Sequence, residues 1–185
     1  MHNRIDALSM EGQFHAALKV ARNLVSFVSD KSFVRLPFMN QAFFEEILAR
    51  PILVLARFEK WNDLLLEPEP NIKDSYTRAI WHYGRGLAYI GLNQSGKAEK
   101  EKAALQEIIH NFSKKKGAEK IPLKLLEIAK YVLEGKIAEN QKQHVKMLEN
   151  YKQALKLESE LPYSEPLLWY HPISQILGSS SLKNG

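Results

Sequence analysis

Tryptophan and histidine side chains stand close together at two distant places in the sequence. Trp81 precedes His82, and Trp169 lies two residues before His171. Imidazole can ligate a metal or exchange protons near neutral pH. If the two clusters met in space, they would form a small-molecule or metal-binding pocket with a regulatory or catalytic use. The alternative interpretation, which we favour, is that these are packing residues whose ring N–H groups bond to neighbouring backbone.

Other catalytic and metal-binding chemistry finds little support. The sequence contains six histidines and no cysteine, so thiolate metal sites, disulfides and a cysteine nucleophile are absent. No histidine belongs to an HExxH motif, and no Ser/His/Asp set can be assembled from residues on separate helices. We therefore expect no catalysis, no bound metal and no cofactor.

Basic residues are concentrated between Lys97 and Lys124, around the stretch SKKKGAEK. Such a cluster can contact phosphate, and the chain carries a net charge of +5. However, charge runs between helices are usually solvated, and no aromatic platform for bases accompanies this one. Weak nucleic-acid binding through residues 97–124 is therefore an alternative function, secondary to the one developed below.

The elements that must position these residues are helices. Apolar residues recur at spacings of three and four along almost the whole sequence, and clusters of Pro, Gly and Ser interrupt the pattern. Hydrophobic content of 45% is typical of a folded chain. We expect Pro51 to kink or split the third helix. The predicted helices are 3–10, 14–29, 38–57, 60–66, 72–92, 95–112, 120–140, 144–160 and 170–183.

The helices alternate with tight turns, and aligning the sequence on these turns reveals a degenerate repeat. The aligned turn residues are Gly12, Glu59, Asn93, Lys142 and Gly185. A small or apolar residue precedes each turn by seven positions, and an apolar residue follows the first four by five. The positions that carry the signature are Gly12, Phe14, Ala17, Trp61, Gly86, Ala98, Gly135, Ala138, Tyr151, Gly178 and Gly185. In this interpretation the small residue lets the two helices of a hairpin approach closely.

This spacing resembles the tetratricopeptide repeat, although only one of the turn-to-turn spacings equals the 34 residues of that family. Stretches such as ARFEKWNDLL and IWHYGRGLAYIGL are also similar to the C-terminal part of long bacterial proteins of this family. The resemblance implies an all-α, right-handed α-solenoid with a terminal half-repeat in a single domain, 1–185. The hairpins would span about 3–29, 38–66, 72–112 and 120–160, and the half-repeat 170–185.

The resemblance also implies a binding groove on the concave face, lined by the first helix of each hairpin. The residues placed there by position are Arg57, Tyr83, Leu87, Lys136, Asn140 and Gln175. Such a groove holds an extended peptide, and Arg57 and Lys136 would pair with an acidic side chain or a C-terminal carboxylate. The predicted function is therefore a protein–protein interaction scaffold without catalysis of its own. The competing interpretation is a groove that other helices fill.

The end of the sequence predicts a further interaction. The resemblance implies a second helix after Gly185, so that the apolar residues of the last helix would lack a covering helix; these are Ile173, Ile176, Leu177 and Leu182. We expect this end either to pair with a second copy of the chain or to fold back on its own solenoid. The first residues contain no apolar signal segment, and no stretch is long and apolar enough to span a membrane, so we expect a cytoplasmic location.

Overall fold

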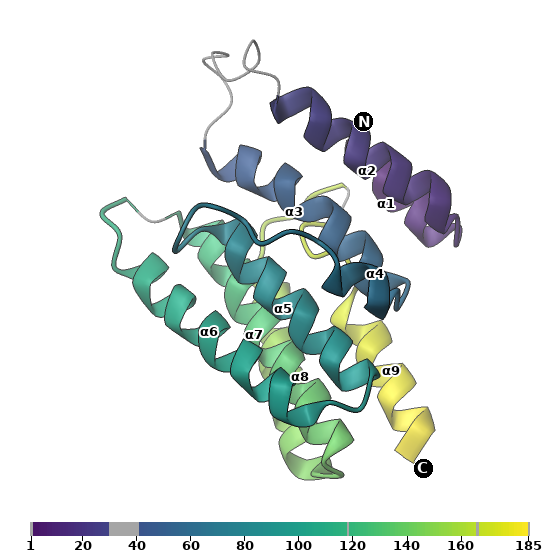
Figure 1. Cartoon of the computed structure of the whole chain (residues 1–185). Helices are drawn as coiled ribbons and strands as arrows, with labels where there is room; N and C mark the ends of the chain where they lie inside the picture. Colours follow the sequence, from purple (N-terminus) through teal and green to yellow (C-terminus); the bar gives the residue numbers. More distant parts are fainter. Residues whose placement is uncertain (1, 30–40, 118, 166, 185) are drawn as a thin grey trace.

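The computed structural model describes residues 2–29, 41–117, 119–165 and 167–184, and every regular element in these ranges is a helix (Figure 1). The prediction of an all-α fold is confirmed for this part of the chain. The helices are α1 (His2–Met10), α2 (Phe14–Ser29), α3 (Gln41–Arg57), α4 (Trp61–Leu65), α5 (Tyr76–Gly91), α6 (Ser95–Ser113), α7 (Lys120–Asn140), α8 (His144–Ser159) and α9 (Ile173–Asn184).

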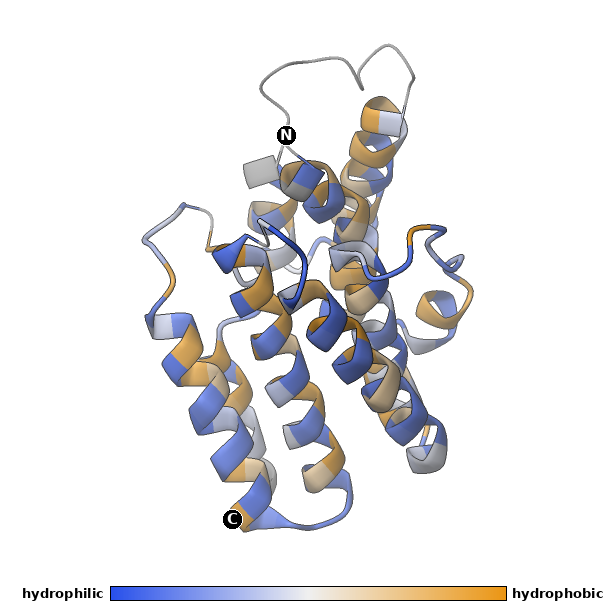
Figure 2. Ribbon diagram, turned by 90° about the vertical axis from the view of Figure 1, so that its left-hand side faces the viewer, coloured by the Kyte–Doolittle hydropathy of each residue, from blue (hydrophilic) through white to orange (hydrophobic). Residues whose placement is uncertain are grey.

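Consecutive helices pack in pairs, α1 with α2, α3 with α4, α5 with α6 and α7 with α8. The pairs are held in sequence because α3 also packs on α2 and α5, and α5 also packs on α7. Hydrophilic and hydrophobic residues alternate along the ribbons, as expected for amphipathic helices that each bury one side (Figure 2). Each pair therefore depends on its neighbour to cover its apolar side.

The four described hairpin turns share one backbone geometry. Their central residues have positive φ, which is 74° at Gly12, 53° at Glu59, 57° at Asn93 and 58° at Lys142. In each turn the next N–H donates to the carbonyl four residues before the turn, over 2.7–2.9 Å. This left-handed cap satisfies carbonyls that the helix end leaves without a partner. The turn alignment made from sequence is thus confirmed at these four positions, whereas Gly185 lies outside the described residues.

The small residues before the turns have different roles. A Cβ at Gly135 would overlap the ring of Tyr151, so this glycine allows α7 and α8 to approach, as predicted. A Cβ at Gly86 would lie 2.7 Å from a methyl carbon of Leu133, which belongs to the next pair. The prediction of a contact within the hairpin is therefore wrong for Gly86. At Gly178 a Cβ would meet nothing within 4 Å, so no close approach requires this glycine.

Residues five positions after each turn form part of the core. Ala17, Leu64 and Ala98 are fully buried, and Met147 is 3% exposed. The other signature residues mostly pack as well: Phe14 lies against Phe58, Trp61 against Gly91, and Ala138 and Tyr151 are buried.

Two helix boundaries differ from the prediction in ways that matter for the site. The helix expected from residue 72 begins at Tyr76, because the Ser75 side chain caps it by accepting from the N–H of Arg78. The helix expected from residue 170 begins at Ile173, after Pro172, whose carbonyl accepts from the N–H groups of Gln175 and Ile176. Trp169 to His171 therefore lie in the connection before α9. Pro51 does not split α3, which continues from Gln41 to Arg57. Residues 38–40, with which this helix was expected to begin, lie outside the described part.

Candidate functional site

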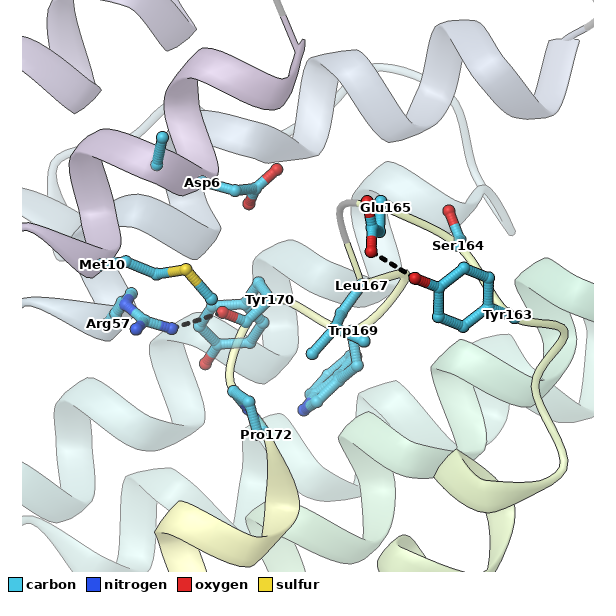
Figure 3. Close-up of a pocket in the computed structure, with 11 residues that line it drawn as sticks. Asp6, Met10, Arg57, Tyr163, Ser164, Glu165, Leu167, Trp169, Tyr170 and Pro172 are labelled. Carbon is cyan, nitrogen blue, oxygen red and sulfur yellow. Dashed lines mark hydrogen bonds between the residues drawn. The ribbon is translucent and has the colours of Figure 1, made fainter.

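Most of the connection between α8 and α9, residues 161–172, lies across the face formed by the first helices of the pairs. We call it the strap; its residue 166 is outside the described part. The strap meets Asp6, Ala7 and Met10 of α1 across a hollow (Figure 3). It also forms hydrogen bonds to α3 and α5. It thus occupies the face where sequence analysis predicted an open groove.

Tyr170 joins the strap to two helices. Arg57, at the end of α3, donates from Nη1 to the Tyr170 carbonyl oxygen over 2.6 Å, as Figure 3 shows. The hydroxyl groups of Tyr170 and Tyr83 are hydrogen-bonded at 2.9 Å. Loss of hydration raises the pKa of half-buried Tyr170 to about 12 and that of fully buried Tyr83 well above its usual value. Both phenols are therefore neutral at pH 7 and act as hydrogen-bonding groups.

Trp169 anchors the strap in the core. Its side chain is 2% exposed, and its ring centroid lies 5.8 Å from that of Tyr83 and 5.1 Å from that of Tyr170. Burial of an aromatic side chain of this size contributes several kcal/mol to stability. Ile173, at the start of α9, is also fully buried, and its N–H donates to the Glu158 carboxylate. The strap is consequently an integral part of the folded chain.

The six groove candidates lie in different environments. Tyr83 and Leu87 are buried, so the prediction that they line an open groove is wrong, and for Tyr83 the strap is the cause. Arg57 is half-buried and already bonded to the strap. Lys136 pairs with Glu139 at 2.9 Å, and exposed Asn140 accepts from Ser95 of α6. Gln175 is exposed on α9.

His171 shows how the strap responds to the charges around it. Its pKa is lowered to about 4, first because burial disfavours the imidazolium and then because Arg57 and Lys136 repel it. His171 is therefore neutral at pH 7. The two cations that were expected to meet a ligand carboxylate both lie near this end of the strap.

Between α1 and the strap lies a hollow with a volume of about 410 Å³. Three apolar side chains at its wall are unusually exposed: Met10 at 65%, Leu167 at 47% and Tyr163 at 85%. Figure 3 shows the Met10 thioether and the Leu167 side chain on opposite sides of it. The remaining lining residues are Asp6, Ala7, Arg57, Ser164, Glu165, Trp169, Tyr170 and Pro172.

Charged groups border the hollow on the α1 side. Asp6 accepts from Arg50 of α3 over 3.3 Å through Oδ1, and its Oδ2 has no hydrogen-bond partner among the described residues. Burial raises the pKa of Asp6 more than the charges of Arg50 and Arg57 lower it. On the strap side, the Tyr163 hydroxyl donates to Glu165. The hollow thus combines an apolar wall with acidic groups and one arginine.

The first tryptophan–histidine cluster lies elsewhere. Trp81 donates from Nε1 to the Glu67 carbonyl over 2.9 Å, and the Arg85 guanidinium lies 4.5 Å from its ring centroid. His82 bonds through Nδ1 to Glu101 of α6 at 2.6 Å. Burial alone would raise the pKa of Glu101, but hydrogen bonds from His82 and Arg85 and their charges hold it below the usual value.

The two clusters therefore have separate neighbours, whereas the pocket hypothesis required them to meet. His82 lies between α5 and α6, while Trp169 and His171 belong to the strap. Among the described residues no group of three His, Asp or Glu side chains is placed to hold a metal ion.

Several lysines of the basic region have partners within the chain. Lys97 lies over the ring of Tyr89, Lys102 pairs with Glu99, and Lys115 donates to the Asp74 carbonyl. Lys124 pairs with Glu160 at 3.0 Å. Nucleic-acid binding by residues 97–124 stays a prediction.

Sequence reasoning missed Met10, Asp6 and Leu167. A signal was present for the strap, because LPYSEPLLWYHP is too rich in apolar and aromatic residues for a solvated loop. Such a connection must be covered by other elements. Nothing in the local pattern of α1 indicates that Met10 would face it.

Comparisons with protein-family models, with curated proteins and with solved structures each found no match to this chain. Within the described ranges, no helix is long and apolar enough to cross a membrane.

Proposed function

We propose that this chain is a tetratricopeptide-like helical solenoid that binds a peptide or protein segment and performs no catalysis. The binding site is the hollow between α1 and the strap. The observation that carries the proposal is the exposure of Met10, Tyr163 and Leu167 around one concave site. Apolar side chains gathered at a hollow on a protein surface mark an interaction site more often than isolated ones do.

The hollow suits one or two apolar side chains of a partner. Its wall offers a methionine, a leucine and aromatic rings, and methionine adapts to differently shaped apolar groups. Exposed Glu165 at the border favours a partner that also carries a basic residue. This differs from the acidic ligand expected for a groove with two free cations, because Arg57 and Lys136 are both engaged within the chain.

A peptide library displayed on phage and selected against the whole chain tests this proposal. We expect enriched peptides to share an apolar residue next to a basic one. Their binding should be lost in Met10→Asp and retained in Leu66→Asp, a matched change at a side chain that is 81% exposed and outside the hollow. Enriched peptides that bind Met10→Asp as well as the wild type would refute the site.

A second candidate function rests on the size of the hollow. About 410 Å³ is within the range of cavities that hold small molecules. In that case an apolar fluorophore would bind saturably, Met10→Asp would abolish the binding, and the library would yield no peptide that depends on Met10.

A further inference from the structure

The exposed side of α8 carries a row of apolar side chains. Val145 is 74% exposed, and Leu148 and Leu155 are each 37% exposed. With Lys152 between the two leucines, these positions follow one another at spacings of three, four and three. That is the spacing of the seam along which two helices pack in a coiled coil.

The row is separate from the side of α8 that faces the core. Met147, Tyr151 and Ala154 are buried against the rest of the chain. On a helix of 3.6 residues per turn, the exposed row lies about 120° around from those three residues. The row is thus accessible while α8 remains packed.

The same side of α8 carries two lysines. Lys152 lies within the row and Lys156 about 60° around the helix from it; both are exposed, and neither forms an ion pair with a described residue. Glu149 is the one acidic residue among positions 142–156. An unpaired lysine in the middle of an apolar seam costs stability when it is covered, unless the covering surface supplies a carboxylate.

From this arrangement we infer that the outer side of α8 docks an amphipathic helix of a partner protein, with an acidic side chain of that helix opposite Lys152. The spacing of the row matches a helix, since an extended peptide presents side chains to one side at every second residue. The row is a poor membrane anchor, because it offers only three apolar side chains and none of them is aromatic. This surface is distinct from the hollow, so the inference does not depend on the proposed function.

Two synthetic helical peptides of equal length provide the test. Both carry leucines at seam spacing; one has glutamates beside the seam and the other has lysines at the same positions. Binding to the whole chain is measured by fluorescence anisotropy at low and physiological salt. We expect the acidic peptide to bind, with a Kd that rises as salt is added and at least about tenfold in Lys152→Glu. The matched control is Lys100→Glu, which makes the same charge change at an exposed position of α6.

The basic peptide should bind only to the double variant Lys152→Glu/Lys156→Glu. Leu148→Asp should weaken the binding of the acidic peptide while leaving all the lysines in place. Equal binding of both peptides to the wild type would overturn the inference, as would an acidic peptide that is insensitive to both Lys152→Glu and Leu148→Asp. Failure to bind the acidic peptide, combined with binding to vesicles containing phosphatidylserine, would overturn it in favour of a lipid surface.

Discussion

Arg57 and Tyr170 are 113 residues apart in the sequence, and the Arg57 guanidinium donates to the Tyr170 backbone carbonyl over 2.6 Å. This bond ties the end of α3 to the strap. It also removes Arg57 from the set of cations free to meet a ligand. The face formed by the first helices of the pairs is thus largely covered by the strap and does not form an open groove.

Replacing Arg57 by alanine should loosen the strap. A charged donor to a half-buried carbonyl is lost, so we expect the free energy of unfolding to fall by about 1–2 kcal/mol. Urea unfolding followed by circular dichroism measures the loss. Arg22→Ala is the control, because Arg22 is largely exposed and its pair with Glu67 is worth less than about 1 kcal/mol. Equal losses in the two variants would show that the Arg57 bond does not hold the strap.

The packing of Gly135 against Tyr151 predicts opposite effects for two glycine-to-alanine changes. Gly135→Ala places a methyl group within the Tyr151 ring and should destabilise the fold by about 1–3 kcal/mol. Gly178→Ala meets no other atom and should stabilise α9 by up to about 1 kcal/mol, because alanine loses less backbone freedom in a helix. The test is the midpoint of urea unfolding of each variant, compared with that of the wild type. A stabilising Gly135→Ala would contradict the close approach of α7 and α8.

The burial of His171 predicts a dependence of stability on pH. Its folded pKa of about 4 lies below the ordinary value of 6.5, so the unfolded chain binds the proton more readily. Stability from this group is present above pH 6.5 and is lost as the pH falls from 6.5 to 4. Allowing for partial solvent screening, we expect a loss of about 2 kcal/mol over this window.

His171→Gln should remove that part of the dependence. The measurement is the difference in unfolding free energy between pH 7.0 and pH 4.5, compared between wild type and variant so that other titrating groups cancel. His144→Gln, at an exposed histidine, is the control and should behave like the wild type. An unchanged difference in His171→Gln would show that His171 is solvated in the folded chain.

The burial of α9 bears on association with a second copy. Ile173 and Ile176 were predicted to lack a covering helix, but both are buried within the chain, at 0% and 4% exposure. Of the two outcomes expected for this end, folding back is the one these contacts favour. Light scattering coupled to size-exclusion chromatography should therefore give a mass near 21.2 kDa. A mass of twice that value at micromolar concentration would show that another surface pairs.

The helices and their turns could be predicted from the sequence because their signals are local. Positive φ at Glu59, Asn93 and Lys142 follows from their place after an amphipathic segment, even though none is glycine. The strap could not be placed, because its partners Arg57 and Tyr83 lie about a hundred residues away in the sequence. For the same reason the contact of Gly86 was assigned to the wrong helix. The hollow depends on this long-range packing and therefore had no local signature.

The most direct test of the account is the affinity of one library-selected peptide for three forms of the whole chain. Isothermal titration calorimetry compares the wild type, Met10→Asp/Leu167→Asp and Leu66→Asp. Both changed residues of the double variant are exposed, so the fold should be retained, and circular dichroism checks this. We expect a Kd at least about a hundredfold higher for the double variant, because it loses two apolar anchors, and an unchanged Kd for Leu66→Asp. Equal affinity for all three forms would mean that the hollow between α1 and the strap is not the binding site.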